Sequence, residues 1–172
     1  GISGIVNVEI TPELVVRLAS AYATPLRKGS VVTTSRDHSR AARALKRAAI
    51  AALNASAIDV RDLEVAPPSV TRLEAGRAGG AGGLMIRTTP GVPESVDIVF
   101  LDSQGIDLSA AAQRKLERVL QRQEFRRAFP GEIGDLSFPP RAVESYVQDL
   151  MGAVDLRGVE DAGLKVVVDC AG

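Results

Sequence analysis

The sequence predicts an α/β protein with a three-layer α/β/α arrangement. Helices should cover both faces of a mixed, mostly parallel four-stranded sheet that has one antiparallel strand. Segments with strand patterns alternate with segments of helical periodicity, which is typical of layered α/β sheets. The strands expected at residues 84–86 and 96–101 are too close in sequence for a helical crossover, so they should pair antiparallel. The chain has 172 residues, of which 45% are hydrophobic and 24% charged, as in an ordinary globular domain.

The first half of the chain opens with alternating apolar and polar residues at 5–10, which predict a short strand. A helix should follow through about residue 23, because Thr11 is a good N-cap and Pro12 suits the first helical position. The next elements follow from the same periodicities: strands at 31–34 and 59–65, a helix at 39–55, and a short helix at 69–77 that begins at a Ser69 cap.

The second half starts with a glycine-rich run at 79–83, which we interpret as a flexible connection before the strand at 84–86. Residues 88–93 are expected to form a loop. Ser109 should cap a helix that extends to about residue 128. The later expected segments are a loop at 129–138, a helix at 140–154 and a buried strand at 164–170.

Composition excludes several classes of function. Lys and Arg together number 21, as do Asp and Glu, and this neutral balance disfavours a dedicated nucleic-acid binder. No apolar run is long enough to span a membrane. The single Cys170 and the single His38 cannot form a disulfide framework or a Cys/His zinc site, and one cysteine suits a reducing cytosol. We therefore expect a cytoplasmic protein with no nucleic-acid partner, no membrane partner and no metal site in this chain.

The best candidate site follows the strand at 84–86, where the chain continues as Arg87, Thr88 and Thr89. Ligands of open α/β sheets collect outside the carboxyl ends of the strands. Two hydroxyls beside an arginine, in a turn with available backbone N–H groups, can hold a phosphate. The residues alone favour the plainer interpretation, a hydroxyl-rich loop between strands.

A second candidate lies where the strand at 31–34 leads into the next helix, because a helix N-terminus attracts anions and Arg36 and Arg40 add positive charge. The plainer interpretation is a turn capped by Asp37 or Ser39. His38 has no catalytic partner nearby in sequence and is expected to be a solvated loop residue. A solvated helix face is the expected role of the basic row formed by Arg114, Lys115, Arg118, Arg122, Arg126 and Arg127.

Four stretches in the same order resemble the first domain of the phosphohexomutase family, which includes phosphomannomutases and phosphoglucomutases. They are Ser-Gly-Ile at 3–5 with the helix start at 11–14, Arg-Asp at 36–37, the strand–loop–strand segment at 83–105, and Gly-Leu-Lys-Val-Val-Val-Asp at 163–169. The resemblance implies that residues 1–162 form domain I and that 163–172 are the first strand of a truncated domain II. It also implies that Ser3, Arg36, Arg87 and Thr88 border a phosphate site.

The chemistry motif departs from the family pattern, in which Thr-Ala-Ser-His-Asn-Pro carries a phosphorylated serine. Thr89 stands at the serine position, Pro90 replaces the histidine, and Val99 stands where the return strand has a lysine. The resemblance implies that the Mg²⁺ of the complete enzyme is bound by later domains. The amino-acid sequence of residues 1–14 also resembles the start of the mutase-like C-terminal region of bacterial mannose-1-phosphate guanylyltransferase fusions, which carry a nucleotidyltransferase domain.

Three hypotheses remain open. The leading one is a degenerate domain I with a structural or sugar-phosphate-sensing role and no mutase activity as an isolated chain. The second is the first domain of an active mutase that uses Thr89 as the phosphocarrier, and the third is an oligomerisation module. The expected partners are a hexose phosphate, the remaining domains of the parent polypeptide and a second copy of the chain. The start at Gly1 and the end just after 164–170 suggest a fragment of a longer protein.

Overall fold

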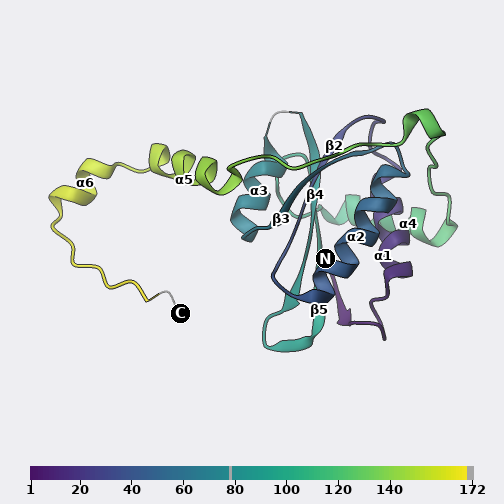
Figure 1. Ribbon diagram of the computed structural model, residues 1–172, viewed down its shortest axis with the longest axis horizontal. Helices are drawn as coiled ribbons and strands as arrows, with labels where there is room; N and C mark the ends of the chain where they lie inside the picture. Colours follow the sequence, from purple (N-terminus) through teal and green to yellow (C-terminus); the bar gives the residue numbers. More distant parts are fainter. Residues whose placement is uncertain (78, 170–172) are drawn as a thin grey trace. The chain divides into compact units, whose positions relative to one another are not determined.

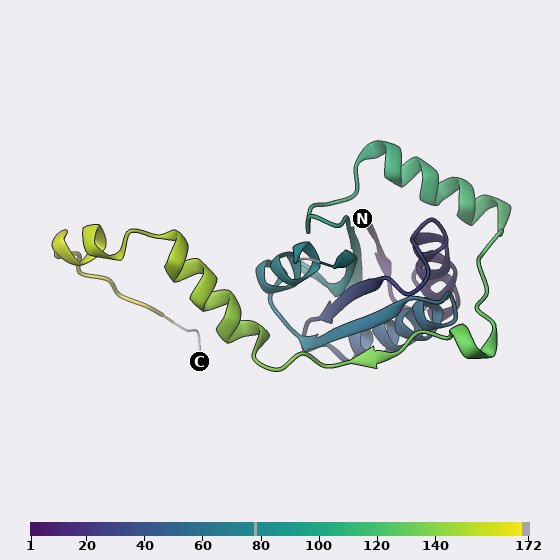
Figure 2. The same ribbon diagram turned by 90° about the horizontal axis from the view of Figure 1, so that it is seen from above.

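The computed structural model describes residues 1–77 and 79–169, and it divides into two compact units at 1–140 and 141–172. The first unit contains a sheet with helices on both faces (Figures 1 and 2). Helices α1 (Pro12–Ala23), α2 (Arg40–Asn54) and α4 (Ala110–Arg122) share one large hydrophobic core with the sheet. Helix α3 (Pro68–Gly76) packs on a smaller cluster formed by Ala75, Met85 and Leu101. The predicted three layers are therefore confirmed.

The sheet has six strands in the order β1-β5-β4-β2-β3-β6. Strand β5 runs antiparallel to both of its neighbours, and the other adjacent pairs are parallel, which confirms a mixed sheet with one antiparallel strand. The expected number of four strands is wrong, because β1 and the very short β6 extend the two edges. The strands are β1 (Ile2–Ile5), β2 (Val31–Arg36), β3 (Asp59–Val65), β4 (Gly80–Thr89), β5 (Val92–Leu101) and β6 (Leu136–Ser137).

The N-terminal strand lies at Ile2–Ile5, not at residues 5–10 as expected. The chain turns back after Ile5, whose carbonyl oxygen accepts hydrogen bonds from the backbone N–H groups of Val8, Glu9 and Ile10. The Glu9 carboxylate also accepts a hydrogen bond of 2.8 Å from the Ile5 backbone nitrogen. These local bonds convert an alternating pattern into a tight loop, in which Ile10 points into the core and Val8 is exposed.

The glycine-rich run begins strand β4 and is not a flexible connection. Gly82 has a φ of +142°, and a Cβ atom there would lie 2.2 Å from the Tyr22 hydroxyl and 2.4 Å from the Leu101 carbonyl oxygen. Tyr22 donates a hydrogen bond of 2.7 Å to this Leu101 oxygen, and its burial raises the pKa of the phenol. Glycine is required here because an aromatic side chain and a neighbouring strand occupy the space of a side chain.

Two helices have different ends from those expected. Helix α3 starts at Pro68 with Pro67 at the N-cap position, so Ser69 does not cap it. Helix α4 ends at Arg122 and not near residue 128, because Gln123 adopts a left-handed conformation with a φ of +57°. Ser109 caps α4 as predicted and accepts a hydrogen bond from the Ala112 nitrogen.

The early end of α4 gives Arg126 a structural role, which corrects its assignment to a solvated helix face. Its guanidinium donates to the backbone oxygens of Ser56 at 2.8 Å and Ala23 at 3.1 Å. Arg126 thereby joins the C-terminal ends of α1 and α2, where carbonyl groups lack helical partners. The solvated face is confirmed for the exposed basic residues on α4 itself, namely Arg114, Lys115, Arg118 and Arg122.

The second unit contains α5 (Ala142–Ala153), close to the helix expected at 140–154, and the short α6 (Leu156–Asp161). The strand expected at 164–170 has no strand pairing over 164–169, and Val167 is 96% exposed. A strand forms only where a neighbouring strand supplies hydrogen bonds. Cys170 lies outside the described residues, and the assignment of 163–172 to a second domain stays a prediction. Within 1–77 and 79–169, no helix has the length and hydropathy needed to cross a membrane.

Candidate functional site

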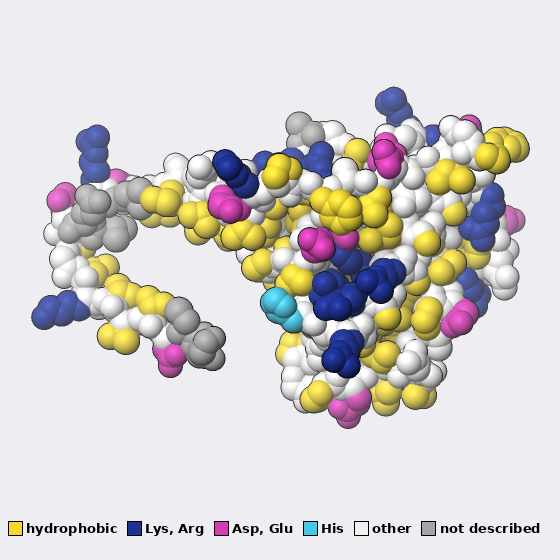
Figure 3. All heavy atoms as spheres, in the orientation of Figure 1, with side chains coloured by type: hydrophobic (Ala, Val, Ile, Leu, Met, Phe, Trp, Pro, Cys, Tyr) yellow, Lys and Arg dark blue, Asp and Glu magenta, His cyan; other side chains and the backbone are white. Residues whose placement is uncertain are grey.

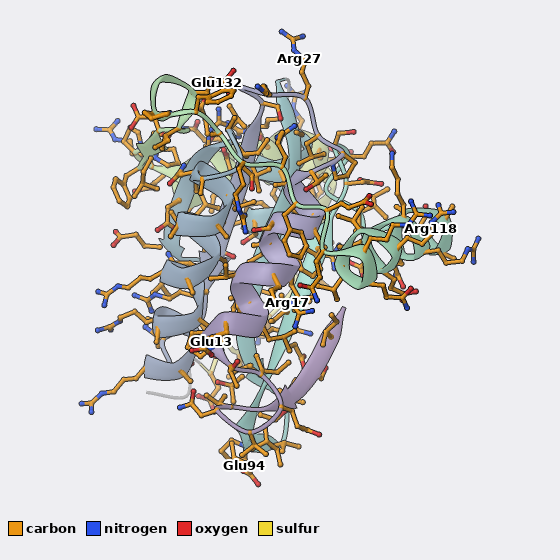
Figure 4. The ribbon with its side chains drawn as sticks, turned by 90° about the vertical axis from the view of Figure 1, so that its right-hand side faces the viewer. Glu13, Arg17, Arg27, Glu94, Arg118 and Glu132 are labelled. Carbon is orange, nitrogen blue, oxygen red and sulfur yellow. The ribbon has the colours of Figure 1, made fainter. Side chains whose placement is uncertain are left out.

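Strands β4 and β5 form a tight hairpin at the end of the sheet where β4 terminates. Only Pro90 and Gly91 separate the paired residues Thr89 and Val92, and Gly91 has a φ of +78°. A proline followed by a glycine with positive φ is typical of a tight β-turn. The loop expected at 88–93 is therefore mostly strand. Figure 4 shows Glu94 of this hairpin at one end of the unit, with Arg27 and Glu132 at the opposite end.

The Thr89 hydroxyl is held within the sheet by its neighbours on β5. It donates a hydrogen bond of 2.7 Å to Asp97 Oδ1 and lies 3.1 Å from the Ser95 hydroxyl oxygen. The Ser3 hydroxyl on β1 donates to the same Asp97 oxygen at 2.8 Å. Three strands thus bring Ser3 and Thr89 to one carboxylate, so two residues predicted from the sequence do lie together.

Arg87 lies directly opposite Asp97 in the β4–β5 register, and its Nε is 3.4 Å from Asp97 Oδ2. Burial opposes ionisation of Asp97. The hydroxyl hydrogen bonds from Thr89 and Ser3 and the positive charge of Arg87 outweigh it and lower the pKa of Asp97. Arg87 Nε is buried without a hydrogen bond, and the guanidinium makes no hydrogen bond to any other described residue. Its outer nitrogens are therefore free to bind an anion.

A cleft of about 390 Å³ lies beside this cluster, between the ends of β2 and β4 and the start of α3. Arg36, Arg87 and Thr88 line it, together with apolar side chains such as Val65 and Met85. The residues lining the cleft do not include Thr89 or Ser3. The structure thus separates the five predicted site residues into a cleft group and a hairpin group, with Arg87 adjacent to both.

Asp37 fixes the floor of the cleft, a role that sequence reasoning missed. Its carboxylate accepts hydrogen bonds from the backbone nitrogens of Thr88 at 2.7 Å and Ser39 at 2.9 Å. Burial opposes ionisation, but these hydrogen bonds prevail and lower the pKa of Asp37. Asp37 therefore joins the ends of β2 and β4, while Ser39 caps α2 through a bond from the Ala42 nitrogen.

The remaining features of the cleft are an exposed histidine and a second arginine. His38 lines the cleft and is exposed, as expected for a solvated loop residue. Arg36 Nη1 donates a hydrogen bond of 2.7 Å to the Asp37 carbonyl oxygen, which holds the guanidinium at the cleft wall. Among the residues that the structure describes, no three His, Cys, Asp or Glu side chains gather as a metal site would require.

Asp97 is the residue of the hairpin group that the sequence reasoning overlooked. The signal for Asp97 is its position in the strand register, because pairing residues 84–86 with 98–100 places position 97 opposite Arg87. A carboxylate opposite an arginine on adjacent strands is a favourable cross-strand pair. Counting the register of the predicted antiparallel pair would have identified it.

This geometry defines a three-layer α/β/α domain with a polar site at the carboxyl end of its central strands. Residues 1–127 match the family described as phosphoglucomutase/phosphomannomutase, alpha/beta/alpha domain I. The chain therefore belongs to this family, and the resemblance noted from its motifs is confirmed at that level.

Individual relatives agree with this assignment. The chain is 32% identical over 170 residues to a probable phosphoglucosamine mutase of Pyrococcus abyssi, an alignment that covers 98% of this chain and 36% of the relative. It is 34% identical over 180 residues to a phosphoglucosamine mutase of Rhodococcus jostii, covering 99% of this chain and 39% of the relative. The chain thus spans well under half the length of the curated relatives it matches.

A solved structure supports the fold. A putative phosphomannomutase from Thermus thermophilus superposes with a TM-score of 0.77 at 24% identity, covering 91% of this chain and 35% of that chain. At this level of identity the likeness concerns the fold alone.

Proposed function

We propose that this chain is a sugar-phosphate-binding first domain in which Thr89 does not carry a phosphoryl group. The observation that supports this proposal is the position of the Thr89 hydroxyl, which donates to Asp97 and is not among the groups that line the cleft. Arg36, Arg87 and Thr88 do line it and offer two guanidinium groups and a hydroxyl. Arginine binds phosphate through charge-assisted, often bidentate, hydrogen bonds.

Electrostatics argue against a phosphorylated Thr89. A phosphoryl group on its oxygen would place nearly two negative charges beside the Asp97 carboxylate, whose oxygen is 2.7 Å away. The lowered pKa keeps Asp97 ionised at neutral pH, so it would repel the phosphate. Pro90, the next residue, supplies no acid, base or hydrogen-bond donor. Phosphoryl transfer depends on positioning and charge stabilisation, and here the Asp97 carboxylate opposes the stabilisation that the Arg87 guanidinium would supply.

The same short hydrogen bond favours a second candidate function, an active mutase with Thr89 as the phosphocarrier. In that case Asp97 would accept the hydroxyl proton as the Thr89 oxygen bonds to the phosphorus of a sugar phosphate. The bond from phosphorus to the sugar oxygen breaks, and that oxygen leaves as a hydroxyl after taking up a proton from solvent. The complete enzyme would bind Mg²⁺ through residues of later domains, as the family resemblance implies.

The deciding experiment is a mutase assay of the parent polypeptide with Mg²⁺, using the 1- and 6-phosphates of glucosamine, mannose and glucose. We expect interconversion to be absent, or equal in the parent and in Thr89→Ala. If the unmodified parent interconverts these phosphates and its Thr89→Ala variant does not, the first candidate is overturned and Thr89 is established as the phosphocarrier.

Binding of the same sugar phosphates to the chain tests the cleft separately. We expect Arg87→Gln to weaken binding about tenfold, the equivalent of about 1.4 kcal/mol. Arg27→Gln, at the opposite end of the unit, is the matched control and should bind normally (Figure 4). The absence of binding to the complete parent would refute a sugar-phosphate-sensing role.

The proposed link to mannose-1-phosphate guanylyltransferase fusions stays a prediction. The sequence of the parent polypeptide tests it, because a fusion requires a nucleotidyltransferase domain before this region. The oligomerisation module also stays a prediction, which sedimentation of the chain at high concentration tests directly.

A further inference from the structure

A second cleft lies beside α2, next to the sheet edge formed by β3 and β6. Its volume is about 610 Å³, within the range of small-molecule sites. Its walls are of two kinds: the cationic side chains of Arg43 and Arg47 on α2, and the apolar side chains of Ile50, Leu136 and Phe138. Figure 3 shows Lys and Arg side chains gathered over α2 next to a hydrophobic surface. Arg36 lines both clefts, which therefore adjoin at this residue, but Arg87, Thr88 and Thr89 do not line the α2 cleft.

A buried ion pair forms the floor of the cleft and neutralises its innermost charges. Lys46 Nζ lies 2.6 Å from Asp62 Oδ2, and both side chains are almost fully buried. Asp62 also accepts hydrogen bonds from the Thr34 hydroxyl and from the Glu64 nitrogen. The floor is therefore rigid and internally satisfied, and Lys46 and Asp62 together contribute no net charge.

The arginines at the rim lack protein partners. Arg43 and Arg47 are exposed and lie four residues apart, on one face of α2. Within the described part of the chain, neither makes a hydrogen bond or an ion pair. Apart from Asp62, which is paired with Lys46, the acidic residue that lines the cleft is Glu64. Arg36 adds a third guanidinium. Like charges at this helical spacing repel each other, so a bound anion would relieve the repulsion.

An exposed aromatic ring lines the same cleft as the arginines. Phe138 is 58% exposed, although the segment before it is fixed to the sheet. Strand β6 pairs with β3, and Asn54 Nδ2 donates to both the Ile58 and the Asp135 carbonyl oxygens at 3.0 Å. A large exposed ring on a fixed backbone is suited to stacking against a flat ligand ring, at little cost in conformational entropy.

From these observations we infer that the α2 cleft binds a nucleotide, with its phosphates on Arg43 and Arg47 and its base against Phe138. Guanidinium groups recognise phosphate oxygens, and aromatic side chains stack on bases of any sequence. The apolar wall of Ile50 and Leu136 extends the surface available to the base. A ligand with phosphates alone would leave this wall exposed, and a nucleoside alone would leave the arginines unpaired.

The test is a calorimetric titration of the 172-residue chain with ADP, pyrophosphate and adenosine at low salt. ADP should bind at least tenfold more tightly than either of the other two. The double variant Arg43→Gln, Arg47→Gln should lose at least tenfold in ADP affinity. Phe138→Ala should bind ADP no better than pyrophosphate, and Phe138→Tyr, which retains a ring, should restore the preference.

The matched control is the double variant Arg17→Gln, Arg27→Gln, which removes the same charge from exposed positions that do not line the cleft. It should bind ADP as the unmodified chain does. All substituted side chains are exposed, and circular dichroism should give identical spectra. Absence of ADP binding at millimolar concentration, equal affinity for pyrophosphate, or equal loss in the control would overturn the proposal. Tighter binding of a single-stranded oligonucleotide than of ADP would also overturn it and assign the cleft to nucleic acid.

Discussion

Asp97 is the residue that organises the hairpin site, because β1 contributes the Ser3 hydroxyl, and β4 the Thr89 hydroxyl and the Arg87 guanidinium, to its carboxylate. Its folded-state pKa lies below the ordinary value. The ionised form is therefore favoured by folding, and this stability is present above the pKa of the unfolded state, about 3.9. It is lost as the pH falls through the lower pKa of the folded state.

Replacing this carboxylate should change how stability depends on pH. Asp97→Asn is expected to lower the free energy of unfolding by about 1 kcal/mol at pH 7, through its weakened hydrogen bonds and ion pair. The difference from the unmodified chain should shrink between pH 5 and pH 2. Urea denaturation across this range measures both effects, with the exposed Glu94→Gln as the control. A difference that stays constant with pH would contradict the assignment.

At the residue scale, sequence reasoning identified the polar groups of the strand ends but not their partners. Arg36, Arg87 and Thr88 were expected to lie together, and they line one cleft. Thr89 was expected among them, but β4 extends as far as Thr89, and the Pro90–Gly91 turn follows it. The alternation of side chains along β4 directs the Thr89 hydroxyl to Asp97. Such partners depend on the strand register, and a short sequence motif does not specify which residues of the neighbouring strand lie opposite it.

At the scale of elements, the glycine-rich start of β4 shows how packing overrides a local signal. Glycines usually indicate flexible segments, and that interpretation was wrong here. Tyr22 of α1 and the Leu101 carbonyl occupy the space next to Gly82, so glycine marks close contact between a helix and two strands. The helix caps at Thr11, Ser39 and Ser109 were predictable because they depend on residues within one turn.

A methyl group at position 82 should therefore be far more damaging than one at another glycine with positive φ. Gly82→Ala is expected to destabilise the chain by about 3 kcal/mol or more, since the new Cβ atom would overlap a backbone oxygen. Gly29→Ala is the matched control: its φ is +71°, but nothing lies within 4 Å of the added atom. It should cost about 1 kcal/mol from backbone strain alone. Equal losses in thermal or urea denaturation would show that contact with Tyr22 and Leu101 is unimportant.

At the scale of the whole molecule, the alternation of strands and helices was sufficient to predict the layers and the single antiparallel strand. It was insufficient for the edges, because β6 is a two-residue strand within a segment without periodicity. The Asn54 side chain and the Asp59 carboxylate hold this segment through the backbone of Asp135. Those contacts join positions far apart in sequence, which a local pattern does not reveal.

The division of the chain near Pro140 gives a prediction about its folding unit. The described side chains of α5 are not buried, whereas the core lies entirely within residues 1–140. A chain ending at Pro140 should retain the free energy of unfolding of the 172-residue chain to within about 0.5 kcal/mol. Urea denaturation of chains ending at 140, 162 and 172 measures this directly. A loss above about 1 kcal/mol on shortening from 162 to 140 would favour the domain border expected near residue 162.

Strand β6 also affects how copies of this chain can associate. It offers only two residues for pairing and is followed, after Phe138, by Pro139 and Pro140, which have no backbone N–H group. An unprotected sheet edge acts as a template for further strands, and short strands and prolines are common ways of blocking it. A second copy therefore cannot extend the sheet beyond β6 by regular pairing. Growth of ordered aggregates by strand addition at this edge is therefore disfavoured.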